Sequence, residues 1–379
     1  MTSMFSKASG AFSGAFSSDE KVEKVKKGDE EGDSLTTVLS TAEDRSALTI
    51  LIADCTELMR QSIIDTFDAK QTGKPADMVS DKDQPPPFST VLSFLSYLYQ
   101  HAYRSARSSL YAYLTLLILL VLVEDATIAK QLCEASAPVR LCRQRPPFLP
   151  LPKTADRPYA ATVLDLLADG VNHNLRKRLD AGFYVQSLTT LHRLISYLAK
   201  SRTKITYHWS ELWRTLLSLV RFLIQYADDL RSISGTTELV AMLVDVLALA
   251  LTTGEAFLPE ARDYDDLFYK LVECGDALVK LRDAYNLAQP DDKSAAINTL
   301  VGVSQHYSEL IESHRAKKQH LSPREVNEII KQGYETLAIE AKEGQEQAAK
   351  FREAEHKVEL KKIARVAVGD AVVIVSGKE

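Results

Sequence analysis

The sequence predicts an all-α protein built as a solenoid of stacked antiparallel helices. Three observations lead to this fold class. Apolar residues recur at helical spacing in segments of about 15 to 25 residues from Phe88 onward. Proline and glycine lie mostly between these segments, and no strand-like alternation occurs before the final AVVIV. Short joints between long helices favour antiparallel neighbours that pack side by side.

The first 37 residues differ from the rest in composition. They combine Ser, Gly and Phe with the charged run SSDEKVEKVKKGDEEGD. Such a segment buries too little apolar surface to offset the entropy lost on ordering. We therefore predict a disordered leader over residues 1–37. N-terminal helices follow over residues 38–137, and a polar, proline-rich loop interrupts them at about residues 70–87.

A proline-rich crossover over residues 138–157 separates these helices from a longer helical domain, which we place at residues 158–370 with a tail at 371–379. Asp156 with Pro158 predicts the start of its first helix. In LSPREV, Ser322 is the predicted N-cap, Pro323 the first helical residue and Glu325 the third, a capping box that fixes a helix start. The predicted helices cover about 158–177, 183–200, 207–227, 236–252, 264–288, 292–316, 323–340 and 341–368.

The arrangement of these helices is typical of an armadillo- or HEAT-like α-solenoid. No clean sequence period is visible, so the repeats are degenerate. A single irregular helical bundle is the alternative architecture.

The stretch YAYLTLLILLVLVED, residues 111–125, raises the question of a membrane span. The uncharged run between Arg107 and Glu124 reaches only about 24 Å as a helix, short of the roughly 30 Å of a hydrocarbon core. We predict a fully buried core helix. The alternative is a single-pass or monotopic membrane protein anchored by the apolar helix at residues 110–123.

Composition and motifs exclude several classes of function. A net charge of -5 does not suggest nucleic-acid binding. The four cysteines show no metal-binding spacing, and the common phosphate, dinucleotide, zinc-protease and serine-hydrolase motifs are absent. We predict no catalytic, cofactor or metal site and therefore no enzyme. A site assembled from His192, His208 and Asp265 would require these side chains to converge.

Two groups of residues are candidates for a partner surface. The first is a basic stretch in NHNLRKRLD, formed by Arg176, Lys177 and Arg178. The second is the pair Trp209 and Trp213, four residues apart on one helix face, for which a place in the core is the alternative. Pro147 and Pro150 form a bare PxxP motif, which is a weak signal for an SH3-type partner beside its interpretation as a crossover.

A basic amphipathic stretch near the C-terminus is a candidate for membrane contact. Its cations alternate with Val358, Ile363 and Val366, so the stretch would present one apolar and one basic face. The alternative is the last helix of the stack, which covers its end with a half-polar face. The candidate membrane-contact residues are Lys357, Lys361, Lys362 and Arg365.

Three ordered blocks carry a resemblance to a known family. They are NHNLRKRLDAGFYVQSLTTLHRLISYLAKSRTKITYHWSELWRTLLSLVRFL, TTGEAFLPEARDYDDLFYKLV and LSPREVNEIIKQGYETL. Together they resemble the C-terminal domain of the armadillo-like helical domain-containing protein 3 family, a domain long labelled as being of unknown function. The resemblance begins near Phe88 and extends to about Ala367.

The resemblance implies a non-enzymatic helical scaffold that is cytoplasmic and peripheral at the Golgi membrane and supports Golgi maintenance and secretion. It also implies two protein partners, phosphatidylinositol 4-kinase beta and a Golgi guanine-nucleotide exchange factor for Arf. Family members usually carry helical repeats ahead of the matching region, where this chain has its short leader. We therefore expect a shortened form or an incomplete gene model, and no individual binding residue is carried over.

Overall fold

The computed structural model describes residues 59–68, 86–144, 146–151, 157–175, 179–287, 294–315, 323–333 and 351–376. The chain divides into two units, residues 48–366 and residues 1–47 together with 367–379. The leader predicted at residues 1–37 lies outside the described residues, as does nearly all of the loop predicted at about 70–87. Of the second unit, the structure describes only the last turns of one helix.

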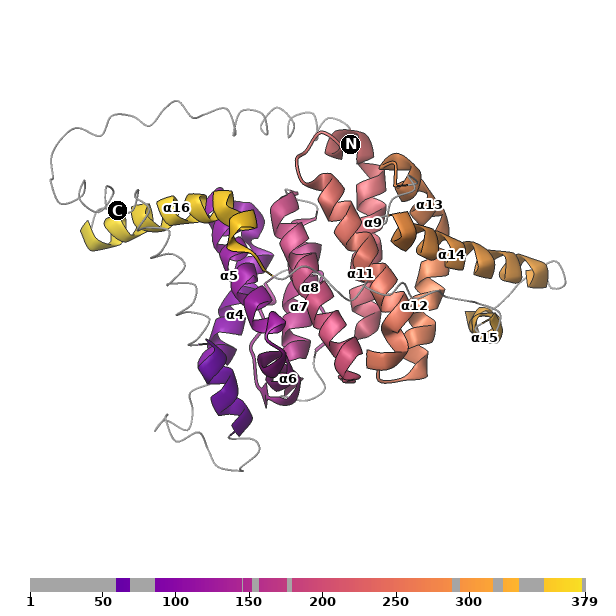
Figure 1. Ribbon diagram of the computed structural model, residues 1–379, viewed down its shortest axis with the longest axis horizontal. Helices are drawn as coiled ribbons and strands as arrows, with labels where there is room; N and C mark the ends of the chain where they lie inside the picture. Colours follow the sequence, from indigo (N-terminus) through magenta and orange to yellow (C-terminus); the bar gives the residue numbers. More distant parts are fainter. Residues whose placement is uncertain are drawn as a thin grey trace. The chain divides into compact units, whose positions relative to one another are not determined.

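Helices of the 48–366 unit stack in two layers, and within each layer every helix contacts the next (Figure 1). The first layer consists of α4 (Pro87–Gln100), α7 (Tyr159–Asn174), α9 (Trp209–Gln225), α12 (Ala261–Glu273) and α13 (Gly275–Ala284). The second consists of α5 (Ala106–Glu124), α8 (Ala181–Ser201), α11 (Thr236–Phe257) and α14 (Ser294–Arg315). This arrangement confirms the predicted all-α, armadillo-like stack.

Further elements complete the described part of the chain. The short ones are η1 (Ala102–Arg104), α6 (Ala126–Glu134), α10 (Ala227–Leu230), α15 (Pro323–Gly333) and η2 (Glu353–His356), with a helical segment at residues 59–68 ahead of them. The longer α16 (Lys357–Ser376) is the last described helix. Residues 371–376, which the sequence analysis places in the tail, instead form the end of α16. Helix α15 begins at Pro323, as its capping box predicts, although Ser322 itself lies outside the described residues.

Polar side chains set several helix starts. Ser105 accepts a hydrogen bond from the backbone N–H of Ser108 at the start of α5. Asp125 accepts two such bonds at the start of α6, and Asp180 accepts one at the start of α8. These side chains satisfy backbone donors that have no partner within their own helix. Polar residues that interrupt the apolar sequence therefore mark helix boundaries.

A single apolar core runs through both layers. Gly254 of α11 lets the ring of Tyr264 approach the helix closely, because a Cβ at this position would lie only 2.6 Å from that ring. The Tyr264 hydroxyl donates a hydrogen bond of 2.7 Å to the carbonyl of Leu251. The block GEAFLPEARDYDDLFY thus forms the tight junction between α11 and α12.

Helix α5 is only partly enclosed. Its C-terminal half, Leu116–Leu120 with Leu122 and Val123, is buried, whereas most residues of its N-terminal half are half-buried. The prediction of a fully buried helix is therefore wrong for the first turns. The reason is that α8 covers one side of the helix more completely than its other neighbours cover the rest.

Two predicted boundaries also differ from the structure. The helix predicted over 264–288 is two helices, α12 and α13, which separate at Cys274. Pro158 lies in β2 (Arg157–Pro158), so α7 begins one residue later, at Tyr159. Strand β2 pairs antiparallel with β1 (Ser136–Ala137), and this pairing closes the base of the loop that the sequence predicts as a crossover.

Candidate functional site

Trp209 and Trp213 lie in the core and not on a partner surface. Their side chains are 1% and 0% exposed, and their rings stack with centroids 5.6 Å apart. Phe257 of α11 packs edge-on against Trp209 at 5.2 Å. Helix α9 turns this face toward α7, α11 and α12, so the surface interpretation of the two tryptophans is corrected.

The basic stretch of Arg176, Lys177 and Arg178 lies outside the described residues. Helix α7 ends at Asn174, just before it. A partner surface there stays a prediction.

The basic stretch on α16 keeps its charges in solvent. Lys357, Lys361, Lys362 and Arg365 are all exposed. The opposite side of the helix buries Leu360 and Ile363 against Leu117 of α5. The apolar side of α16 is thus used within the fold, as expected for a helix that covers the side of a stack, and its basic side is left available for an anionic partner.

Two polar contacts strengthen the junction of α5 with the segment before α16. The Tyr113 hydroxyl and Nδ1 of His356 are 2.7 Å apart. The backbone N–H of Phe351 donates to the carboxylate of Glu124 at 3.0 Å, and Glu124 also pairs with Arg193 of α8 at 3.3 Å. Burial lowers the pKa of His356 below its usual value, so this histidine favours its neutral form at the junction.

The residues considered for a catalytic site have separate partners. His192 contacts Ser196 of its own helix, and burial lowers its pKa to about 4. His208 contacts Asp165 at 2.8 Å, and Asp265 pairs with Lys331 at 3.1 Å. The structure therefore accounts for each of the three candidates by a different local contact.

A buried polar cluster between α7 and α9 escaped the sequence analysis. Arg157 forms an ion pair with Asp165, whose side chain is almost fully buried. Nε2 of His208 lies 2.8 Å from the other carboxylate oxygen of Asp165, but the two groups are not aligned for a hydrogen bond. The only sequence signal was the spacing of Asp165, Asp169 and His173 at four-residue intervals in an otherwise apolar helix.

Asp169 lies one helical turn after Asp165 and belongs to the same cluster. Burial, together with the nearby Asp165 carboxylate, raises the pKa of Asp169 to about 7. Gln100 donates to its carboxylate at 3.3 Å, and Arg143 acts in the same direction, so both lower the pKa in part. Such a group is a common mark of a functional site, but here it lies inside the helix stack.

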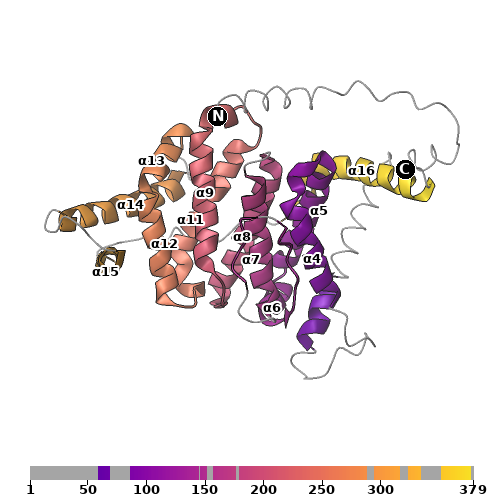
Figure 2. The same cartoon turned by 180° about the vertical axis from the view of Figure 1, so that it is seen from behind.

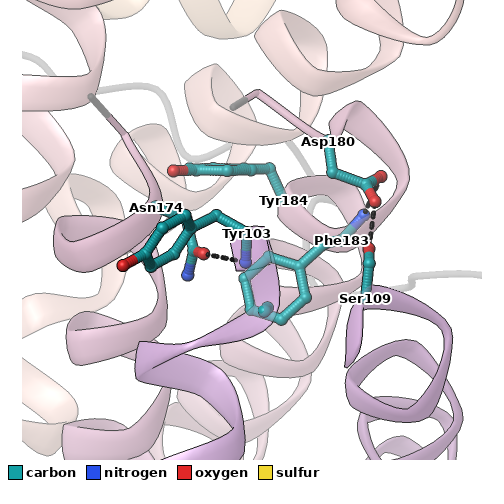
Figure 3. Close-up of a pocket in the computed structure, with 7 residues that line it drawn as sticks. Tyr103, Ser109, Asn174, Asp180, Phe183 and Tyr184 are labelled. Carbon is teal, nitrogen blue, oxygen red and sulfur yellow. Dashed lines mark hydrogen bonds between the residues drawn. The ribbon is translucent and has the colours of Figure 1, made fainter. Parts of the chain in front are cut away.

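The cavities found beside these helices are too small for a metabolite. One, between α5, α7 and α8, has a volume of about 10 Å³ and is lined by Asn174, Asp180 and Phe183, among others (Figure 3). Asn174 accepts from the backbone N–H of Tyr103 at 2.9 Å, and Asp180 accepts from Ser109. A second, apolar cavity between α7, α8 and α9 has no room for a water molecule. The polar groups around the first cavity therefore join helices to one another.

No group of three or more His, Cys, Asp or Glu side chains suited to a metal ion occurs among the described residues. Cys133, Cys142 and Cys274 are free. Burial raises the pKa of Cys133 to about 12, so its thiol stays protonated and unreactive at neutral pH.

Two helices in the described part are long and apolar enough to cross a membrane. They are α5, with 44% of its most apolar window buried, and α11, with 61% buried. The sequence analysis considered only the first. Core helices of water-soluble proteins pass the same test, and α11 packs between α8 and α14.

Comparison with known proteins places this fold in a family. Residues 157–373, more than half of the chain, match the model described as armadillo-like helical domain-containing protein 3, C-terminal. The chain belongs to the armadillo-like helical domain-containing protein 3 family. The match begins at β2 and covers α7 to α16, including the polar cluster and the tryptophan pair.

Curated relatives extend the similarity toward the N-terminus. A protein of Schizosaccharomyces pombe named UPF0588 membrane protein is 26% identical over 75% of this chain and 46% of its own length. Armadillo-like helical domain-containing protein 3 is 28% identical in Danio rerio, over 67% of this chain and 38% of that protein. The Homo sapiens protein is 27% identical over 64% and 38%. The chain spans less than half the length of these relatives, and no solved structure matches it.

Membership of this armadillo-like helical family is consistent with a helical scaffold. The names of the relatives denote no enzymatic activity, and one relative is named a membrane protein. That name, together with the two apolar helices, is consistent with membrane association.

Proposed function

We propose that this protein is a non-enzymatic helical scaffold that binds other proteins at the cytoplasmic side of the Golgi membrane. The observation that carries the proposal is the two-layer stack of an armadillo-like family, built around an apolar core. The two cavities described above do not admit a metabolite. Such stacks act through extended side surfaces.

The proposed partners are phosphatidylinositol 4-kinase beta and a Golgi exchange factor for Arf, on the basis of the family resemblance. A scaffold that binds both proteins raises the concentration of one near the other without any chemistry of its own. Golgi maintenance and secretion would then depend on the phosphoinositide that the kinase makes locally.

Capture from cells tests this proposal. The tagged full chain should retain the kinase or the exchange factor, and purified components should reproduce the complex. The triple variant Arg176→Glu, Lys177→Glu and Arg178→Glu tests the first predicted partner surface. The matched control reverses three charges on α16, at Lys361, Lys362 and Arg365, which are exposed. Absence of both partners from the wild-type capture would contradict the proposal.

A single-pass or monotopic membrane protein anchored by residues 110–123 is the alternative function. The incomplete burial of α5 and the name of the fission yeast relative favour it. Glycosylation acceptor sites inserted after Lys74 and, separately, after Lys153 flank this helix on either side. Translation with microsomes should modify one of the two if α5 spans the membrane, and neither if the protein is peripheral.

A further inference from the structure

Exposed large apolar side chains gather on two adjoining segments of the structure. Phe94 and Tyr97 on α4 are 60% and 41% exposed, and Phe148 and Leu151 on the loop after β1 are 50% and 71% exposed. Among the other described residues, only Val358 and Val373 are large, apolar and exposed to a similar degree. A cluster of exposed apolar side chains often marks an interaction surface, whereas such side chains scattered singly do not.

Hydrogen bonds hold the loop along α4. Ser93 accepts from the backbone N–H of Arg140 at 3.2 Å, and Ser96 accepts from that of Cys142 at 2.7 Å. Gln100 donates to the carbonyl of Cys142 at 2.7 Å. Phe94 and Tyr97 each directly follow one of the two serines in sequence. Their side chains therefore project about 100° around the helix from the side that binds the loop.

The far part of the loop is anchored as well. Leu149 is buried, and Arg143 donates a hydrogen bond of 3.0 Å to its carbonyl. The same guanidinium lies 5.2 Å from the centre of the Phe148 ring. The exposed side chains are therefore presented by a fixed backbone. We name Phe94, Tyr97, Arg140, Arg143, Phe148 and Leu151 the aromatic–arginine face.

The two segments that form this face carry charge of one sign, and Asp169 of α7, the carboxylate that Arg143 acts on, is buried. No Asp or Glu occurs from residue 84 to 123 or from 135 to 155, whereas the same stretches contain Arg104, Arg107, Arg140, Arg143, Arg145 and Lys153. The whole chain has a net charge of -5, so this excess of cations is local. Arg104, Arg140 and Arg143 are exposed. An anionic surface would complement the exposed arginines of this face.

The chemistry of the face matches the surface of a bilayer. Aromatic rings partition into the headgroup region, aliphatic side chains insert slightly deeper, and arginines pair with anionic lipids. Helix α4 stands at one end of its layer, in contact with α7 and α5 (Figure 2). The helical segment at residues 59–68 meets its first turn, where the backbone N–H of Phe88 donates to Ser62. Phe94 and Tyr97 lie further along α4.

We propose that the aromatic–arginine face docks this protein on anionic lipid bilayers as a peripheral protein. This inference rests on the proposed function, because it supplies the membrane contact of the proposed scaffold. It places that contact on α4 and its loop and not on the basic side of α16. It also requires no opening of the helix stack.

Sedimentation with vesicles tests the proposal on the purified full chain. The probes are vesicles of phosphatidylcholine with phosphatidylserine and vesicles of phosphatidylcholine alone. We expect binding to the anionic vesicles, weakened by added salt. The variant Arg140→Glu should bind at least about fivefold more weakly, which is the effect of one cation lost near the membrane surface. Phe148→Ser with Leu151→Ser should weaken binding by about tenfold or more.

Matched controls come from α16. Lys361→Glu changes the same charge as Arg140→Glu, and Val358→Ser removes an apolar side chain that is 60% exposed. Both should bind like the wild type. All variants should melt at the temperature of the wild type, since the substituted side chains are exposed.

Several results would overturn the docking proposal. They are no binding of the wild type to anionic vesicles, unchanged binding by the face variants, or equal losses in the α16 controls. Capture of the kinase and the exchange factor, measured with the same variants, separates this proposal from the proposed function. Loss of that capture with vesicle binding unchanged would assign the face to a protein partner and overturn the lipid proposal.

Discussion

Ile363 of α16 packs against Leu117 of α5 in a small apolar cluster that Leu360 completes. The two segments are far apart in sequence, and their contact covers part of the helix that the sequence presents as a possible membrane anchor. The position of α16 therefore decides how much of α5 is open to solvent or lipid.

Ile363→Asp tests this contact. A carboxylate at a buried position without a partner is strongly disfavoured, so we expect the start of α16 to detach from α5. Hydrogen exchange should become faster in residues 108–117 and 357–366 but not in α11. Lys362→Asp, at the neighbouring exposed position, should leave exchange unchanged. Equal hydrogen exchange in both variants would mean that this cluster does not hold α16 against α5.

Trp213→Ala tests the assignment of the tryptophan pair to the core. Removal of a fully buried indole should lower the free energy of unfolding by about 3–5 kcal/mol, through lost transfer energy and the cavity left behind. Thermal or denaturant unfolding measures the change. Arg214→Ala, next in sequence and exposed, should change it by less than about 0.5 kcal/mol. A loss below about 1 kcal/mol for Trp213→Ala would argue against a core role.

Asp165→Asn tests the buried ion pair. The substitution leaves Arg157 without its counter-charge and removes the contact with His208, so we expect a loss of about 3 kcal/mol or more in unfolding free energy. The control is Asp228→Asn, which removes an ion pair at the surface and should change stability by less than about 1 kcal/mol. Similar losses in the two variants would contradict the burial of the pair.

Asp169 should make stability depend on pH. Its pKa is about 7 in the folded chain, above its usual value, so the folded state binds more protons between about pH 4 and 7. The free energy of unfolding should therefore fall as the pH rises through this range, by at most about 4 kcal/mol, and level off above it. Asp169→Asn should flatten that slope and be the more stable protein at pH 8. A slope unchanged by the substitution would contradict the raised pKa.

The helices themselves were largely predictable from local patterns. Helix α8 was expected over 183–200 and extends over Ala181–Ser201, and α15 begins at the proline that its capping box identifies. Apolar spacing and caps are properties of neighbouring residues, and a single sequence displays them directly. The break at Cys274 was missed, because nothing local stops the helix there except Gly275.

The candidate surfaces were less predictable, because they depend on contacts between distant segments. Trp209 and Trp213 have the same spacing whether they face a core or a partner. What decides is the packing of Trp209 against Phe257, with Trp213 stacked on Trp209. The aromatic–arginine face arises where a loop returns to α4 through three hydrogen bonds. No local pattern predicts that return.

Alkaline carbonate extraction of membranes from cells that express the full chain tests the central claim most directly. A peripheral scaffold whose α5 is a core helix should appear in the supernatant. Retention in the membrane pellet would contradict the account, most clearly if Leu117→Arg with Leu120→Arg abolished retention in a chain that still folds. In that case α5 inserts into the bilayer, and the stack must open to release it.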